Sequence, residues 1–508
     1  MGSTDTLKRA ARIVFALIIV TATPISASAK TWRVAETESF RVYSAGPEKK
    51  LKQLTIKLQQ FDQLLRLMTD LKADPPPDKF DIYLVKKSAD IRRFTSLGKN
   101  VAGFYRATPT GTAAFALRSN TSSGDTSKTW SLTSQQVLFH EYAHHFMLRY
   151  FPYPYPPWYV EGFAEYVSTA QFKDDVVLLG DYSRGRGFAV AAGRWLPMET
   201  LLSPTRPDLS DSETGLFYAQ SWLLTHYLLR DPERQEKMHA FLAKFSSAET
   251  LEADFKAAFD MDFKHLKKNL RRYMKGRDGG MTMSGVDRSK LRDVTVTIST
   301  LPPSAEDVLL IQAKLNLGID TGYKDEVLGA LETAIKEHED DLLAQRTWAQ
   351  AQIAFGKTHA GRARLKALAQ RHPGDAQIRF HIGFSHFVDG TNADPGSPAM
   401  AEAFKQAKRY FAKAYQRDAA HYPTLYYYYS TLPQPVSPNE RRTLEEAAFL
   451  APQVDEIRLK LAQMWAYEGD DADRAAARKI LQILSNDPHG GPVAFAARKV
   501  LNDLKAMQ

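Results

Sequence analysis

Two short stretches, His140-Glu141-Tyr142-Ala143-His144 and Glu161-Gly162-Phe163-Ala164-Glu165, constrain the fold of this chain more than any other feature. Residues at positions i and i+4 share one face of a helix, so His140 and His144 can direct two imidazole nitrogens at one zinc ion. Glu141 lies one step round the same helix, where it can take a proton from water at an open coordination position. A later glutamate supplies the third ligand. The fold must therefore bring two helices together around one ion.

The first stretch lies in a sequence that is typical of a helix. Thr133 followed by Gln136 is a capping-box pattern, and Val137, Leu138 and Phe146 continue an apolar helical periodicity. This is the context that the metal chemistry requires. The alternative is an amphipathic core helix that carries polar histidines and a glutamate by chance.

The second stretch follows a proline-rich turn, with Pro157 suited to the first turn of a new helix. Glu161 and Glu165 then lie one turn apart on one face. One carboxylate can bind the metal while the other accepts a hydrogen bond from the outer ring nitrogen of a ligating histidine, and the residues alone do not say which. Gly162 would allow a neighbouring helix or the metal to approach closely. The alternative is that both glutamates are ordinary solvated helix residues.

Together, HEYAHH and PPWYVEGFAEY resemble the gluzincin metallopeptidases, and among them the peptidase-MA-like domains of bacterial envelope proteins. The resemblance implies that His140, His144 and Glu161 are the zinc ligands. It also implies that Glu141 is the general base and that Glu165 orients a ligating histidine, His140. The interval from His144 to Glu161 is shorter than in the thermolysin-like and aminopeptidase branches, so their substrate preferences are not implied.

Further along, Tyr218-Ala-Gln-Ser resembles a helix of the same family, Tyr-x-Gln followed by Ala or Ser. A tyrosine hydroxyl near the metal can stabilise the oxyanion that forms at an attacked carbonyl, which makes Tyr218 a second catalytic candidate. The alternative is a core aromatic packed with Phe217 and Trp222. We interpret His145 and His226 as structural residues.

Upstream of the first helix, residues 79–85 read as a strand, and residues 101–107 and 112–118 read as a hairpin. In gluzincins an edge strand at this point holds an extended peptide through main-chain hydrogen bonds. We therefore predict that the second hairpin strand binds substrate, and the alternative is an ordinary edge strand. The residues of this predicted strand are Ala113, Ala114, Phe115, Ala116 and Leu117.

The first 29 residues have the order of a secretory signal peptide. Lys8, Arg9 and Arg12 precede the short apolar run 13–20, which is followed by the small residues 27–29. We expect cleavage between Ala29 and Lys30 and an exported protein, either periplasmic or secreted, in the bacterial cell envelope. An uncleaved anchor is the alternative. No later segment is apolar and long enough for a stable membrane span.

The composition limits which residues can bind a metal and which partners the chain is expected to have. The chain has no cysteine, so disulfides and thiolate zinc sites are excluded, and histidine and carboxylate remain as the strong metal ligands. The formal charge is +9, of which the predicted signal peptide carries +2, leaving +7. Such an excess suggests some attraction to anionic envelope surfaces. The sequence contains no nucleic-acid-binding motif, and we expect no nucleic-acid partner.

Strand patterns followed by helices predict an α+β zincin-like catalytic domain over residues 30–275. Residues 276–304 form the predicted linker, although 294–298 alternate like a strand that can pair back. Residues 305–508 predict an all-α helical repeat domain. Similar units begin at Asp341 and Asp375, 34 residues apart, which resembles tetratricopeptide repeats.

Repeats of this kind stack helix pairs into a concave surface for peptides or proteins. The aromatic run 426–429 covers every side of a helix turn, so it belongs partly to the core and partly to the groove, or wholly to the core. Each repeat buries its core against its neighbours, so we predict that residues 305–508 fold by themselves.

These observations favour an exported zinc-dependent metallopeptidase whose helical repeats recruit the peptide or protein substrate or an envelope protein partner. Retention of Glu141 with a full ligand set supports catalysis. The alternative is a catalytically silent, repeat-based scaffold or binding protein of the cell envelope. A third hypothesis keeps the zinc chemistry and replaces the substrate with another envelope component, such as a cell-wall peptide.

Overall fold

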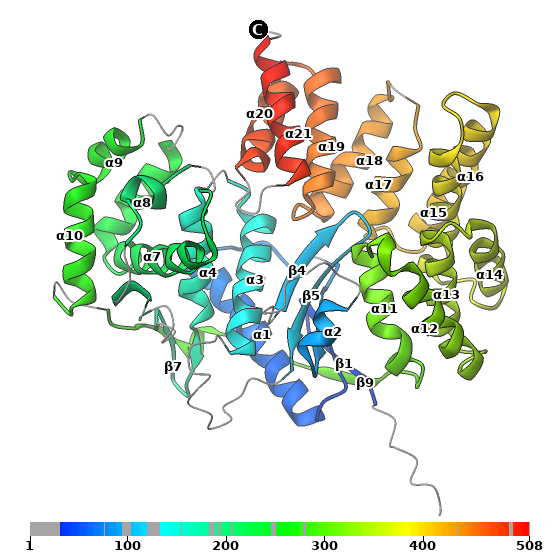
Figure 1. The fold of residues 1–508 in the computed structure, drawn as a ribbon, viewed down its shortest axis with the longest axis horizontal. Coiled ribbons are helices and arrows are strands. Elements are labelled where there is room, and N and C mark those ends of the chain that lie inside the picture. The colour runs from blue at the N-terminus through cyan, green and yellow to red at the C-terminus, as the bar shows by residue number, and fades with distance from the viewer. Residues whose placement is uncertain are drawn as a thin grey trace, which may run out of the picture. The chain divides into compact units, whose positions relative to one another are not determined.

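The structure, a computed structural model, describes residues 31–506 except 76, 94–102, 119–132, 154, 182–186, 188, 192–194, 205–206, 245–249, 278–280, 434 and 487–490. Residues Thr31–Gln508 form one compact unit. The predicted signal peptide, residues 1–29, lies outside the described residues. The chain is mostly helical, with a mixed sheet formed by strands between residues 33 and 300, followed by a series of helices from residue 305 onward (Figure 1).

The strands are β1 (Arg33–Glu36), β2 (Phe40–Ser44), β3 (Phe80–Val85), β4 (Gly103–Thr108), β5 (Gly111–Leu117), β6 (Gln171–Phe172), β7 (Val176–Leu179), β8 (Ser284–Asp287) and β9 (Thr297–Thr300). The helices of the N-terminal half are α1 (Glu48–Met68), α2 (Ser88–Arg92), α3 (Ser134–Tyr150), α4 (Pro157–Ser168), α6 (Met198–Leu201), α7 (Asp211–Leu229), α8 (Pro232–Lys244), α9 (Leu251–Phe259) and α10 (Phe263–Met274). The repeat helices are α11 (Ala305–Leu317), α12 (Lys324–Glu337), α13 (Leu342–Ala354), α14 (Thr358–Arg371), α15 (Ala376–Asn392), α16 (Pro398–Tyr415), α17 (Tyr422–Ser430), α18 (Pro438–Leu450), α19 (Asp455–Glu468), α20 (Asp471–Ser485) and α21 (Pro492–Ala506).

Six of the described strands form one mixed sheet in the order β4-β5-β3-β2-β1-β9. Strands β2, β3 and β5 are parallel, whereas β4, β1 and β9 run antiparallel to their neighbours. The predicted linker, 276–304, therefore contributes strands. Its β9 pairs with β1, as expected for a strand that pairs back, but it covers residues 297–300 and begins three residues later than the predicted 294–298. Its β8 completes a smaller sheet with β6 and β7.

The central strands β3 and β5 are covered on both faces. Alternate residues of each strand point to opposite sides of the sheet and belong to different cores. Ile82 and Leu84 of β3 belong to the large core that includes α1 and α3. Tyr83 and Val85 belong to a second core that includes one face of α11, with Leu309 among its residues. In Figure 1, α3 and α11 lie on opposite sides of β4 and β5.

Helix α11 is thus both the first helix of the repeat region and a covering layer of the sheet. Its apolar face is shared with the sheet, so the repeat region alone would leave that face exposed. This packing argues against our prediction that residues 305–508 fold by themselves.

The hairpin predicted around residues 108–111 is present, but the prediction that residues 113–117 form an edge strand is wrong. Strand β5 pairs with β3 on one side and with β4 on the other, so its main-chain groups are already satisfied. Among the described residues, β4 has no strand on its outer side. The edge that can accept an extended peptide is therefore Gly103–Thr108.

The repeat helices pack on their neighbours along the chain, as in α13 with α14 and α15 with α16. The two units recognised 34 residues apart begin with the same N-cap. Asp341 accepts a hydrogen bond from the amide of Ala344 at 2.9 Å, and Asp375 accepts one from Ile378 at 3.0 Å. In the aromatic run, Tyr429 is buried and residues 426–428 are partly exposed, so the run divides between core and surface.

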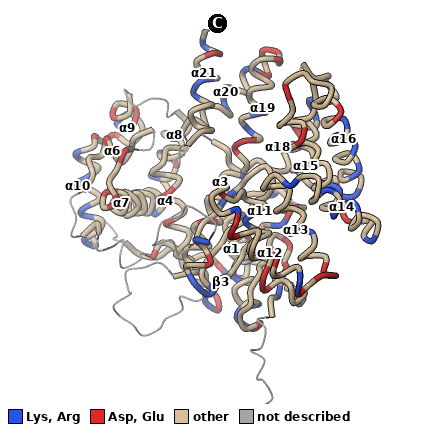
Figure 2. Tube along the Cα trace, turned by 45° about the vertical axis from the view of Figure 1, so that its right-hand side comes forward, with Lys and Arg blue, Asp and Glu red and all other residues tan. Residues whose placement is uncertain are grey.

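The described surface agrees with the modest net charge. Acidic and basic residues are interspersed along the helices (Figure 2). Among the described residues, no helix is both long and apolar enough to cross a membrane.

Candidate metal centre

Helix α3 begins where the capping-box pattern predicted. The hydroxyl of Thr133 accepts a hydrogen bond from the Gln136 amide at 3.2 Å, and the Gln136 side chain accepts one from the Thr133 amide at 2.9 Å. Both bonds satisfy amide groups that a helix start otherwise leaves without partners. The helix therefore has a fixed start seven residues before His140.

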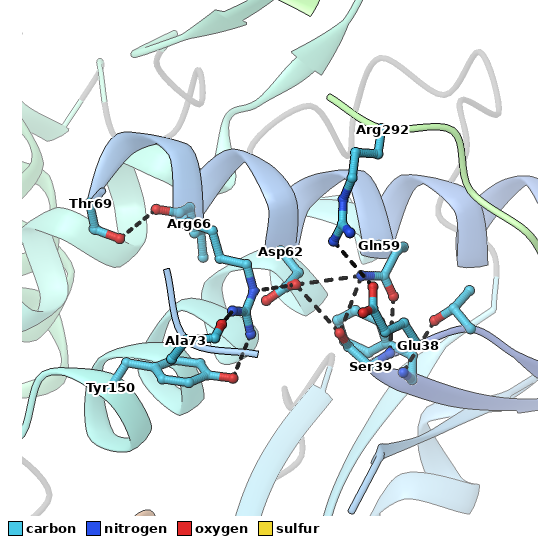
Figure 3. A network of polar contacts seen from close by, with 12 residues as sticks. Glu38, Ser39, Gln59, Asp62, Arg66, Thr69, Ala73, Tyr150 and Arg292 are labelled. Atoms are coloured by element: carbon cyan, nitrogen blue, oxygen red, sulfur yellow. Dashed lines mark hydrogen bonds and ion pairs between the residues drawn. The ribbon is translucent and has the colours of Figure 1, made fainter. Parts of the chain in front are cut away.

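A buried polar network then holds α3 against α1 (Figure 3). Asp62 of α1 is 1% exposed and accepts hydrogen bonds from the Tyr142 hydroxyl at 2.6 Å and from Arg66 Nε at 2.8 Å. Arg66 in turn donates to the Tyr150 hydroxyl at 2.6 Å. Tyr142 and Tyr150 lie on either side of His144 in the sequence, so α1 holds the helix at two points around this residue.

Helix α4 carries Glu161 and packs against both α3 and α7. Pro157 occupies its first turn, as predicted. A Cβ atom at Gly162 would lie 2.2 Å from Thr225 Oγ1 and 2.5 Å from the Ser221 carbonyl oxygen of α7. Only glycine allows this approach, so Gly162 sets the distance between α7 and the helix that carries Glu161.

Gly162→Ala is expected to lower the free energy of unfolding by at least about 2 kcal/mol, because the new methyl group meets backbone that cannot move aside. The control is Gly215→Ala on α7, where a Cβ would meet no heavy atom within 4 Å. This variant should be neutral or more stable by up to about 1 kcal/mol, since alanine favours helix. Urea unfolding of both variants is the measurement. Equal stability of the two would contradict the close helix contact.

The two helices bring three candidate ligand atoms together. The Nε2 atoms of His140 and His144 are 3.0 Å apart, and Glu161 Oε2 lies 3.4 Å from each of them. Two ligands about 2.05 Å from a tetrahedral zinc ion lie about 3.3 Å apart. Glu161 is 2% exposed, and its Oε2 has no hydrogen-bond donor among the described residues. The spacing and this buried acceptor fit a cation bound by all three residues.

Electrostatics at the cluster favour positive charge. Burial opposes ionisation of Glu161, but the imidazoles of His144 and His140 outweigh burial and hold the pKa of this carboxyl well below its ordinary value. Burial lowers the pKa of His140, but Glu161, Glu165 and Glu141 together raise it to about 9. A metal ion would therefore compete with a proton for His140.

Glu165 lies behind His140, on the side away from the cluster. Its Oε1 atom is 3.6 Å from His140 Nδ1, whereas Glu161 approaches His140 Nε2. The two glutamates thus divide between the inner and outer nitrogens of one imidazole, in the arrangement that the resemblance implied. The distance is within ion-pair range and longer than a hydrogen bond.

Glu165→Ala is expected to weaken zinc binding by about 10-fold to 100-fold, the usual cost of losing the partner of a ligating histidine. Glu161→Ala should cost far more, because it removes one of three direct ligands. Glu165→Gln keeps a hydrogen-bond acceptor and should lie between the wild type and Glu165→Ala. Competition with a chromophoric chelator measures the affinities. Zinc retained by Glu161→Ala and lost by Glu165→Ala would reverse the two assignments.

Two cavities reach the cluster. Glu141 and His144 line one of about 530 Å³, together with β4 and the end of α3. Glu161 and Tyr218 line another of about 180 Å³. The Tyr218 ring centroid is 6.3 Å from that of His140, and Tyr218 is partly exposed. Tyr218 is therefore a cavity residue beside the cluster, and the core alternative does not describe it.

The remaining histidines near the cluster have structural surroundings. His145 is buried against Phe80, and its Nδ1 lies 3.2 Å from the Tyr105 hydroxyl of β4. Burial lowers the pKa of His145 to about 3, so it stays neutral. His226 Nδ1 lies 2.9 Å from the Tyr273 hydroxyl.

Sequence reasoning missed two parts of this region. The first is Asp62, whose signal was a carboxylate among the apolar positions Leu58, Phe61 and Leu65 of α1. The second is the contribution of the repeat helices α19–α21 to the larger cavity. No local pattern marks these helices, because the contact joins segments that are more than 300 residues apart.

Comparisons with known proteins add little to this geometry. No family model matches the sequence, and no curated protein matches it. The solved structure of a thermophilic TPR protein from Thermus thermophilus is similar to part of the chain, with 19% identity and a TM-score of 0.30. The match covers 36% of this chain and 92% of that protein. A likeness of this size identifies neither a family nor a function.

Proposed function

We propose that this chain is an exported, zinc-dependent metallopeptidase of the gluzincin type, with a zincin-like catalytic domain. The observation that carries the proposal is the cluster of His140, His144 and Glu161, with Glu141 lining a cavity that begins at the cluster. Two imidazoles and one carboxylate, with a further carboxylate next to the open side, match the donor set of a hydrolytic zinc site.

His140, His144 and Glu161 would hold the ion, and Glu165 would orient His140. A bound zinc ion supplies Lewis acidity, which polarises a carbonyl and lowers the pKa of water. Glu141 takes one proton from the attacking water and delivers it to the leaving nitrogen as the carbon–nitrogen bond breaks. Tyr218 donates a hydrogen bond to the oxygen of the attacked carbonyl. Water and an amide are thereby converted to a carboxylic acid and an amine.

The proposed substrate is an extended peptide or protein segment. Strand β4 lines the larger cavity over residues 103–107, beside Glu141 and His144. Its outer main-chain groups can pair with a peptide as an added strand, which would lay the peptide along the base and one ligand. A volume of about 530 Å³ lies within the usual range for ligand cavities.

The test is metal content combined with cleavage of an unbiased peptide library by the purified full chain. One zinc per chain and cleavage that stops on chelation and returns with zinc are the expected results. Zinc binding without any cleavage would overturn the peptidase proposal. It would favour the alternative of a repeat-based scaffold in the envelope, because the tetratricopeptide-like region is suited to protein interactions.

A further inference from the structure

The larger cavity has walls from both halves of the chain. One wall contains Glu141, His144 and Tyr105 of β4. The opposite wall comes from the last helices of the repeat region, with Glu456 of α19, Ile483 of α20 and Val493 of α21. The repeat region therefore lines the same cavity as the candidate base, which differs from a surface that recruits substrate at a distance.

Hydrogen bonds across the two halves fix this second wall. Arg149, at the end of α3, donates to Gln453 Oε1 at 2.9 Å and to the Leu450 carbonyl oxygen at 3.0 Å. The Tyr422 hydroxyl donates to the Thr108 carbonyl oxygen at the end of β4 at 3.0 Å. Gln453 and Tyr422 are buried. These hydrogen bonds thus hold the repeat helices against both α3 and the edge strand β4.

The cavity between these walls is mainly apolar. Met147 and Leu148 of α3 face the same space as Ile483 and Val493 of the repeat helices. On α19, Arg458 Nη1 lies 3.3 Å from Asp455 Oδ1 and neutralises it, whereas Glu456 adds one negative charge to the repeat wall. The part of the cavity formed by Met147, Leu148, Ile483 and Val493 can be filled by an apolar side chain.

We propose that α20 and α21 form a specificity subsite, in which Ile483 and Val493 contact a large apolar side chain of the peptide that pairs with β4. This inference rests on the proposed function and extends it to the substrate class. Peptides with leucine or phenylalanine next to the cleaved bond are the preferred substrates, and peptides with alanine there are poor ones. The repeat region acts as part of the substrate site.

The test is Ile483→Trp, which fills the subsite, with Gln482→Trp as the matched control at an exposed neighbour on the same helix. Peptides that differ only in alanine, leucine or phenylalanine next to the cleaved bond are the probes. We expect Ile483→Trp to lower kcat/KM for the leucine and phenylalanine peptides at least about 10-fold and for the alanine peptide less than about 2-fold. Gln482→Trp should leave all three values unchanged.

Binding of the same peptides to zinc-loaded Glu141→Gln protein, with and without Ile483→Trp, is the second readout and does not depend on turnover. If the Glu141→Gln protein binds the phenylalanine peptide most tightly and Ile483→Trp removes this preference, the subsite is supported. This holds even if the wild type cleaves no peptide, because absence of cleavage would overturn only the peptidase proposal. Equal binding of all three peptides, or equal losses for all three in the variant, would overturn the subsite. Normal zinc content and a cooperative thermal transition establish that the variant is folded.

Discussion

Glu141→Gln is expected to bind zinc like the wild type and to cleave peptide at least about 10²-fold to 10⁴-fold more slowly. Glutamine keeps the size of glutamate and some of its hydrogen bonding, but it cannot take a proton from water. The ligand cluster is built from other residues, so metal affinity should change little. The measurement is kcat/KM on a peptide found in the library, together with zinc content of the same preparation.

The control for this variant is Glu233→Gln on α8, which makes the same chemical change at an exposed ion pair with Lys237. It should leave activity within about 2-fold of the wild type, because exposed ion pairs contribute little. Full activity of Glu141→Gln with normal zinc would rule out Glu141 as the base. Loss of zinc in the Glu141→Gln variant would mean that Glu141 contributes to zinc binding.

A chain that ends at Thr300 is expected not to fold, although it keeps every candidate ligand and all the strands of both sheets. Without α11, the sheet face that carries Val85 and Phe115, and also Ile91 of α2, becomes exposed. Three such side chains lose about 5–9 kcal/mol of burial, comparable with the whole stability of a typical domain, about 5–15 kcal/mol. The contacts that Lys314 of α11 makes with the carbonyl oxygens of Asp90 and Ile91 are lost as well.

The matched control ends at Ser485 and removes α21, which packs mainly against α19 and α20. This shorter deletion should keep the sheet and the cluster of His140, His144 and Glu161. Circular dichroism, size-exclusion chromatography and zinc titration of the two truncated chains are the measurements. A chain ending at Thr300 that melts cooperatively and binds zinc would show that the sheet needs no cover from the repeat region.

The parts of the site that could be predicted are those specified by local sequence. The capping pair Thr133 and Gln136 predicted the start of α3, and the i, i+4 spacing of His140 and His144 predicted that two candidate ligand atoms share one face of this helix. Gly162 marked a close helix contact that the structure contains. Each of these inferences depends on residues within about one or two helical turns of each other.

The parts that could not be predicted depend on partners far along the chain. Residues 113–117 and 103–108 have similar strand patterns, and only the pairing of β5 with β3 decides which of the two is the edge. The packing of α11 on the sheet could not be predicted either. An apolar helix face has the same sequence pattern whether it packs on a sheet or on another helix. For these features, sequence patterns indicate burial and do not name the partner.

Because β1 pairs with β9, the six-stranded sheet can be completed only after most of the preceding chain has been made. Strand β1 holds residues 33–36 and β9 holds residues 297–300, so a growing chain carries an incomplete sheet until residue 300 has been added. Contacts between residues so distant in sequence form late and slow folding. Until then β1 presents an unpaired edge, which invites aggregation. The sheet can therefore close only after residues 297–300 have been made, and until then the β1 edge needs protection, for example by chaperones.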